Sequence, residues 1–119
     1  MFGDENEIFS FKSGQDNHWI HLKDIMYFES LDRKIVIVDS ENKTHEFYGT
    51  MDNVFDQIKS SGFMMIHKSY IINYRYVCEF HSSEIIMDNG KALPISKHRK
   101  NEVLKWRLKM ETGGKNNHE

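Results

Sequence analysis

The residues best suited to chemistry in this chain form three polar or basic clusters, and their side chains favour binding over bond-breaking. The clusters are Arg33 and Lys34, then His67, Lys68 and Ser69 with Asn73 four residues further on, and finally Lys97, His98, Arg99 and Lys100. Lys and Arg supply positive charge for phosphate, whereas Ser, Asn and His can hydrogen-bond either a phosphate or the edge of a base. These residue types therefore indicate a surface that could hold phosphates or read bases.

Each cluster also has a purely structural interpretation, and the residue types alone do not decide between the two. His67–Ser69 could simply form a polar turn between core strands, with His67 or Asn73 bonding local backbone. Residues 97–100 follow a predicted strand and open a predicted helix, where cations oppose the positive end of the helix dipole. This unfavourable placement hints at an anionic partner, with a solvated helix start as the alternative. Arg33 and Lys34 alone are most simply an ordinary charged turn.

Catalytic and metal-binding chemistry find little support in the sequence. The chain has no G-x-S-x-G motif, phosphate-binding glycine loop or dinucleotide fingerprint. His18 and His21 would point to opposite faces of a strand, so they could not share a metal. Cys78 lies in an apolar and aromatic run, which predicts a buried small side chain, although a Cys–His dyad stays formally open. We therefore expect no enzymatic activity, cofactor, metal or small-molecule substrate.

Size and composition bound the class of protein. The 119 residues predict a single domain over residues 1–119, with a core over about residues 7–105 and a loose tail over 111–119. The lone cysteine excludes a disulfide framework, and no apolar run approaches the roughly 18 residues that cross a bilayer. The acidic first residues are unlike a signal or transit peptide. We expect a cytoplasmic protein with no membrane partner.

The net charge of −2 speaks against a nucleic-acid partner, but the charges are segregated along the chain. Residues 1–30 sum to −4 and residues 31–60 to −2, whereas residues 61–110 carry nine Lys or Arg and four Asp or Glu, a sum of +5. Such asymmetry points to nucleic acid or another anionic surface, with an ordinary mixed surface as the alternative. The basic segment holds two of the three clusters.

Short runs of β-branched and aromatic residues, separated by turn residues, predict a β-rich domain. The predicted strands cover residues 7–12, 18–22, 25–30, 35–38, 43–48, 64–66, 70–72, 74–80, 84–87 and 91–96. A change of period predicts a helix capped by Thr50 or Asp52 and ended by Gly62, and a second helix over residues 97–110. Asn89-Gly90 predicts a tight hairpin turn.

In combination, several segments resemble the LytTR DNA-binding domain of bacterial transcriptional regulators. The matching segments are 24–30, 47–50, 62–63, 66–73, 89–90 and 93–97, in the family's order and at its spacing. The pairing of a His-x-Ser-x-x-x-Asn block (67–73) with a Pro-x-Ser-basic block (94–97) is the specific part. The resemblance covers about residues 7–105. It implies a mainly β fold of about ten short strands in small packed sheets, with one short central helix and a C-terminal helix.

The resemblance also implies a function, which is sequence-specific binding of double-stranded DNA for transcription regulation. Family members read DNA with loops that enter successive major grooves, not with a recognition helix. Carried onto this chain, the reading loops are Asp32–Lys34, then His67–Ser69 with Asn73 nearby, and finally Lys97 with His98, Arg99 and Lys100 beside it. Some relatives carry Asn or Arg where Lys68 stands, so Lys68 implies a phosphate or guanine contact. Many carry Arg where Lys97 stands, and Lys lacks the planar fork of Arg.

The resemblance raises two questions of assembly. We expect two copies on repeated half-sites of a promoter, because one small module buries only about 600–1,000 Å². Most relatives carry a receiver or membrane domain, whereas only about six residues precede the first predicted strand here. The chain is thus either free-standing or the output domain of a longer two-component regulator. The alternative function is a protein–protein interaction module that keeps the fold without binding DNA.

Overall fold

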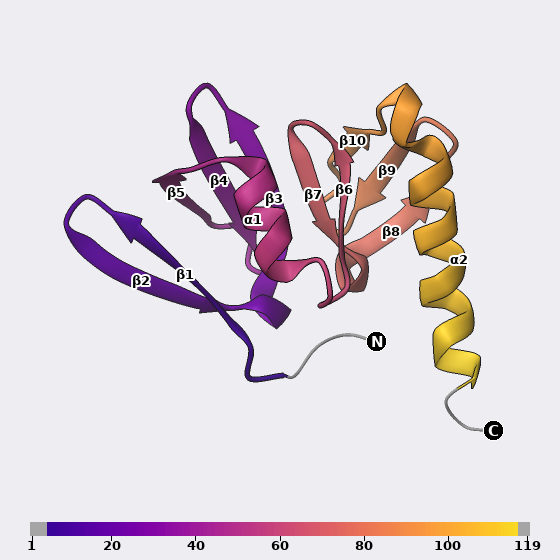
Figure 1. Cartoon of the computed structure of the whole chain (residues 1–119), viewed down its shortest axis with the longest axis horizontal. Helices are drawn as coiled ribbons and strands as arrows, with labels where there is room; N and C mark the ends of the chain where they lie inside the picture. Colours follow the sequence, from indigo (N-terminus) through magenta and orange to yellow (C-terminus); the bar gives the residue numbers. More distant parts are fainter. Residues whose placement is uncertain (1–4, 117–119) are drawn as a thin grey trace.

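The computed structural model describes residues 5–116, which form ten strands, two α-helices and three short 3₁₀ turns (Figure 1). In chain order the elements are β1 (Ile8–Ser13), β2 (Asp16–His21), η1 (Leu22–Asp24), β3 (Ile25–Leu31), β4 (Lys34–Asp39), β5 (Thr44–Tyr48), α1 (Met51–Ile58), β6 (Phe63–His67), β7 (Tyr70–Asn73), η2 (Tyr74–Tyr76), β8 (Val77–Phe80), β9 (Glu84–Met87), β10 (Ala92–Pro94), η3 (Lys97–Arg99) and α2 (Lys100–Asn116). The predicted mainly β class is confirmed.

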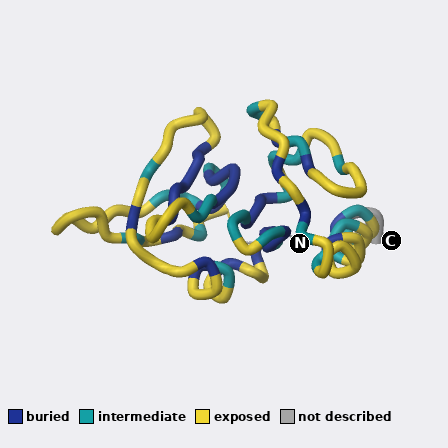
Figure 2. Tube along the Cα trace, turned by 90° about the horizontal axis from the view of Figure 1, so that it is seen from above, coloured by how far each residue is buried: buried dark blue, intermediate teal, exposed yellow. Residues whose placement is uncertain are grey.

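A five-stranded antiparallel sheet with the order β5-β4-β3-β7-β6 forms the centre of the fold. Its central strands are buried on both faces. On one face, Phe28 and Ile35 pack with residues of α1 and with Phe9 of the β1–β2 hairpin. On the other face, Val36 packs in a cluster with Ile85 of the three-stranded sheet β10-β9-β8. Figure 2 shows the buried stretches gathered in the central strands, with exposed turns around them.

α1 forms over the predicted segment and is capped by Thr50 rather than Asp52. The Thr50 hydroxyl oxygen accepts the backbone N–H of Asn53 at 3.3 Å, which satisfies one of the free donors of the first turn. The helix ends at Ile58, four residues before the predicted stop. Gly62, at a φ of 87°, turns the chain into β6 instead of capping the helix, and this left-handed conformation favours glycine.

α2 packs beside β6, at the edge of the five-stranded sheet, and reaches Phe80 at the end of β8. Val103 belongs to the cluster between the sheets, and the Trp106 ring lies 5.6 Å from Tyr74 and 6.3 Å from Phe80, centroid to centroid. The predicted apolar face of this helix is therefore covered by the domain itself. In the described part of the chain, neither helix is long and apolar enough to cross a membrane.

The predicted strand over 74–80 is wrong in its first half. Residues 74–76 form the turn η2, because the Asn73 side-chain oxygen accepts the backbone N–H of Arg75 at 3.0 Å and bends the chain. Cys78 is exposed, not buried as predicted, since it lies on β8, an edge strand of the three-stranded sheet.

The predicted loose tail is also wrong over residues 111–116, because α2 continues to Asn116. Arg107 and Glu111 are four residues apart and their charged atoms lie 2.9 Å apart, which supports the additional turns. Residues 117–119 lie outside the described part of the chain.

Asp39 anchors the turn between β4 and β5. Its carboxylate accepts the backbone N–H groups of Glu41 and Lys43, both at 2.9 Å, and lies 2.9 Å from Nε2 of His45. Burial alone would raise the pKa of Asp39, but these hydrogen bonds outweigh it and hold the pKa below its ordinary value of 3.8. The ionised carboxylate is thus the form that the fold prefers.

Asp39→Ala should lower the free energy of unfolding at pH 7 by about 1–3 kcal/mol, since three donors lose a shared acceptor. Because the pKa is lowered in the folded state, this difference is present above about pH 4 and is lost as the pH falls through the lowered value. Urea unfolding of both proteins at several pH values measures it. The matched control is Asp56→Ala on the exposed face of α1, expected within about 0.5 kcal/mol. An undiminished difference at pH 2 would contradict the role of the charge.

Candidate nucleic-acid interface

The three predicted clusters lie along one edge of the molecule. The first is the turn between β3 and β4, the second is the turn between β6 and β7, and the third is η3 with the start of α2 (Figure 1). All three lie at the upper side of this view, and the edge runs along the longest dimension of the molecule. The fold therefore brings together clusters that are separated by more than twenty positions in the sequence.

Backbone hydrogen bonds hold these three segments to one another. Ser30, at the end of β3, donates its N–H to the carbonyl oxygen of Ser69 in the second turn at 2.9 Å. Ser96, just before η3, donates both its N–H (2.9 Å) and its hydroxyl (3.3 Å) to the carbonyl oxygen of Ile66 at the base of the same turn. The second turn is thus the link between the other two.

The first turn presents Arg33 and restrains Lys34. Asp32 adopts a left-handed φ of 59°, which suits a tight hairpin turn and leaves Arg33 exposed at its tip. Lys34 begins β4, where its ammonium lies 3.4 Å from the carboxylate of Glu46 and 5.9 Å from the ring centre of Tyr48. Such an exposed ion pair is weak, so Lys34 stays free to exchange Glu46 for a stronger anion.

The second turn presents Lys68, with His67 partly buried beneath it. Lys68 and Ser69 are the two residues of the turn, and the Ser69 N–H donates to Nδ1 of His67 at 3.0 Å. Burial lowers the pKa of His67 below its ordinary value, and the charges of Lys68, Arg99 and His98 lower it further. His67 is therefore neutral near pH 7, and the positive charge of this turn comes from Lys68.

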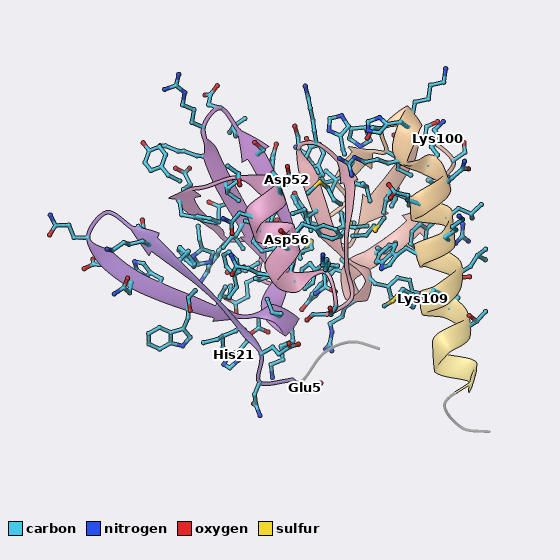
Figure 3. All side chains as sticks on the ribbon, in the orientation of Figure 1. Glu5, His21, Asp52, Asp56, Lys100 and Lys109 are labelled. Atoms are coloured by element: carbon cyan, nitrogen blue, oxygen red, sulfur yellow. The ribbon has the colours of Figure 1, made fainter. Side chains whose placement is uncertain are left out.

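The third segment places two exposed side chains, Lys97 and His98, on the 3₁₀ turn that precedes α2. Arg99 is half-buried, and its Nε atom is enclosed without a hydrogen-bond partner among the described residues. The ammonium of Lys100 donates to the hydroxyl of Ser83 at 3.3 Å, and Figure 3 shows Lys100 at the end of α2 that meets this edge.

Asn73 is the one predicted site residue that the structure removes from the interface. It is only 2% exposed, and its amide donates to the carbonyl oxygens of Ile25 (2.9 Å) and Leu22 (3.4 Å). Its side-chain oxygen accepts from Arg75. These contacts fix the start of β3 against the end of β7. Asn73 is therefore a core residue, which contradicts its predicted role as a DNA contact.

Most cations of this edge have no carboxylate partner among the described residues. Within residues 5–116, no carboxylate lies within 4.0 Å of the charged nitrogens of Arg33, Lys68, Lys97, Arg99 or Lys100, whereas Lys34 has Glu46. The sequence reasoning missed Ser30 and Ser96, which position the turns through backbone bonds. Ser96 sits inside the Pro-x-Ser-basic block and could have been found there, but nothing in the sequence distinguishes Ser30.

Metal ligation and Cys–His chemistry are the other possibilities raised by the sequence. Among them, no group of three or more His, Cys, Asp or Glu side chains is placed to hold a metal ion. The exposed Cys78 lies on β8, and the pairs that the histidines form are with single carboxylates, His45 with Asp39 and His81 with Glu79.

Comparison with known proteins decides the family. A family model for the LytTr DNA-binding domain matches residues 16–107. The chain belongs to the LytTR family. Domains of this family bind DNA and occur in response regulators. The fold agrees, since the structure is similar to that of the LytTr DNA-binding domain of a putative methyl-accepting/DNA response regulator from Bacillus cereus. The TM-score is 0.71 at 21% sequence identity, over 87% of this chain and 97% of that chain. No curated protein matched the chain.

Asn73→Ala tests the correction to the LytTR site. We expect the free energy of unfolding to fall by about 1–3 kcal/mol, because buried backbone groups lose their partners. Chemical denaturation measures the change, and Asn101→Ala on the exposed face of α2 is the control, expected within about 0.5 kcal/mol. The folded Asn73→Ala protein should keep its DNA affinity. A stable variant with lost affinity would restore Asn73 to the interface.

Proposed function

We propose that this LytTR domain binds double-stranded DNA sequence-specifically and thereby regulates bacterial transcription. The turns at Arg33, Lys68 and Lys97 enter the major groove on one face of the duplex, and their neighbours contact the backbone between. The domain acts in the cytoplasm, either as the output domain of a two-component regulator or as a free-standing LytTR regulator.

The observation that carries this proposal is the row of cations on one edge, most of which have no carboxylate partner among residues 5–116. Cations left without carboxylate partners cost stability by mutual repulsion, and phosphate groups of DNA would remove that cost. The edge follows the longest dimension of the molecule, 47 Å, which matches an elongated partner better than a compact one. The neutral donors Ser69 and His67 stand beside Lys68, so the same turn offers both charge and hydrogen bonds.

One observation favours the alternative, a protein–protein interaction module. Tyr48 is 76% exposed and Leu31 56% exposed, and both line an open groove of about 690 Å³ beside the first turn. Exposed apolar side chains of this kind are often interaction sites. Because Arg33 and Lys34 line the same groove, a titration with DNA tests whether the groove binds DNA or another protein.

DNA binding by this edge should depend steeply on salt. Titration of a labelled promoter duplex by fluorescence anisotropy, at two or more salt concentrations, should show the affinity falling with salt, because each phosphate contact releases counterions. Lys68→Ala and Lys97→Ala should each weaken binding about tenfold at low salt and reduce the slope by about 1.

The matched control is Lys109→Ala, which changes the same residue type on α2 at the end far from the proposed edge (Figure 3). It should leave the affinity unchanged. If Lys68→Ala and Lys97→Ala also have no effect, the proposed turns are wrong even if DNA is bound. If the wild-type protein binds no promoter DNA at low salt, the interaction module is the better function.

The dimensions of the domain predict the spacing of two copies. With its 47 Å axis along the duplex, two copies on one face cannot fit one helical turn apart, which is about 34–36 Å. Two turns, about 21 base pairs, leave room for both. Gel shifts with two half-sites at spacings of about 10, 16 and 21 base pairs should show simultaneous binding to one face only at about 21. Equal double occupancy at 10 would contradict this orientation.

A further inference from the structure

We propose that His67 is a hydrogen-bond donor of fixed direction that selects a hydrogen-bond acceptor on DNA. The inference rests on the proposed DNA binding and adds what the second turn recognises. A histidine can be a donor or an acceptor at either ring nitrogen, so its residue type leaves its reading chemistry open. The conformation of the second turn removes that freedom.

The backbone of Ser69 determines which ring nitrogen carries the proton. The Ser69 N–H can only donate, and it points at Nδ1 of His67 from 3.0 Å. Nδ1 must therefore be unprotonated, which puts the proton of the neutral ring on Nε2. Among the described residues, Nε2 has no hydrogen-bond partner and is not one of the enclosed polar atoms, so its N–H is accessible. His67 thus offers one donor and no free acceptor.

The surroundings of His67 keep it in this neutral form. Its ring packs against Tyr70 of β7 at 5.7 Å between centroids, and the Tyr70 hydroxyl donates to Glu29 of β3 at 3.4 Å. The other charged or titratable groups near His67 are Lys68, on the same turn, and His98 and Arg99, on η3. A proton on Nδ1 would displace the Ser69 hydrogen bond and add a positive charge beside those of Lys68 and Arg99.

A donor of this kind selects a limited set of partners on the duplex. In the major groove, guanine presents N7 and O6, adenine N7 and thymine O4 as acceptors, whereas the amino groups of adenine and cytosine are donors. A phosphate oxygen is also an acceptor. The shared chemistry is a hydrogen-bond acceptor, and a base and a phosphate can be separated by experiment.

Two substitutions separate the two nitrogens of the ring. In His67→Asn the side-chain oxygen takes the place of Nδ1 and keeps the Ser69 hydrogen bond, but no group reaches the position of Nε2. In His67→Gln the amide nitrogen takes the place of Nε2, but no acceptor remains for Ser69. On a duplex selected from a random library with the wild-type protein, His67→Asn should bind about 2- to 12-fold more weakly, the effect of one hydrogen bond. His67→Gln should lose less affinity per folded molecule.

Modified duplexes then identify the acceptor. 7-Deazapurines remove N7, 2-aminopurine removes guanine O6, 5-methyl-2-pyrimidinone removes thymine O4, and methylphosphonates neutralise single phosphates. At one position of the duplex, the modification should weaken binding by the wild-type protein but not by His67→Asn. That position then holds the acceptor of the Nε2–H group. A modified base at that position indicates base reading, and a methylphosphonate indicates a backbone contact.

The pH dependence provides a second readout at constant ionic strength. Because the neutral ring is the binding form, the ratio of wild-type to His67→Asn affinity should not rise as the pH falls from 8 to 6. A ratio that rises with each unit of acidification would show that the imidazolium binds and would overturn the proposal. Equal affinity of His67→Asn and wild type, or no coupling to any modification, would overturn it while leaving DNA binding intact. Failure of the wild-type protein to bind DNA would overturn both.

Discussion

The five-stranded sheet with two buried faces is the constraint on which the rest of this structure depends. Because β3 and β4 are covered on both sides, neither strand can slip in register without exposing a buried face. The register determines where their shared turn projects, and the pairing of β3 with β7 places the second turn beside it. The positions of the proposed binding turns thus follow from packing in the core.

The polar residues of the proposed reading segments divide into two kinds according to burial. Asn73 satisfies buried carbonyl groups and contributes to folding, whereas Lys68 and Lys97 are exposed and contribute little to it. His67 belongs to both kinds, because one nitrogen completes the turn and the other is left for a partner. This division explains how one short motif can support the fold and present a binding surface.

The net charge of −2 and the basic edge are compatible because charge acts locally. The acidic side chains of α1, labelled in Figure 3, lie on the helix that covers the central sheet rather than on the proposed edge. At physiological salt, interactions between exposed charges fade over about 8 Å. A duplex at the edge would respond to Lys68 and Lys97, while acidic surfaces elsewhere would repel a duplex that docks in another orientation.

The sequence by itself determined most of the strands, the presence of two helices and the cationic clusters, because alternation, caps and turn residues act within about ten positions. It could not decide that Asn73 is core or that Cys78 is exposed, since both depend on which strands become neighbours. Nor could it decide which nitrogen of His67 is free, because that depends on the geometry of the turn. Only the tertiary structure placed the three clusters, which are separated by more than twenty residues, on one edge. The physical reason is that burial of both sheet faces selects one strand order, and the strand order decides which turns meet.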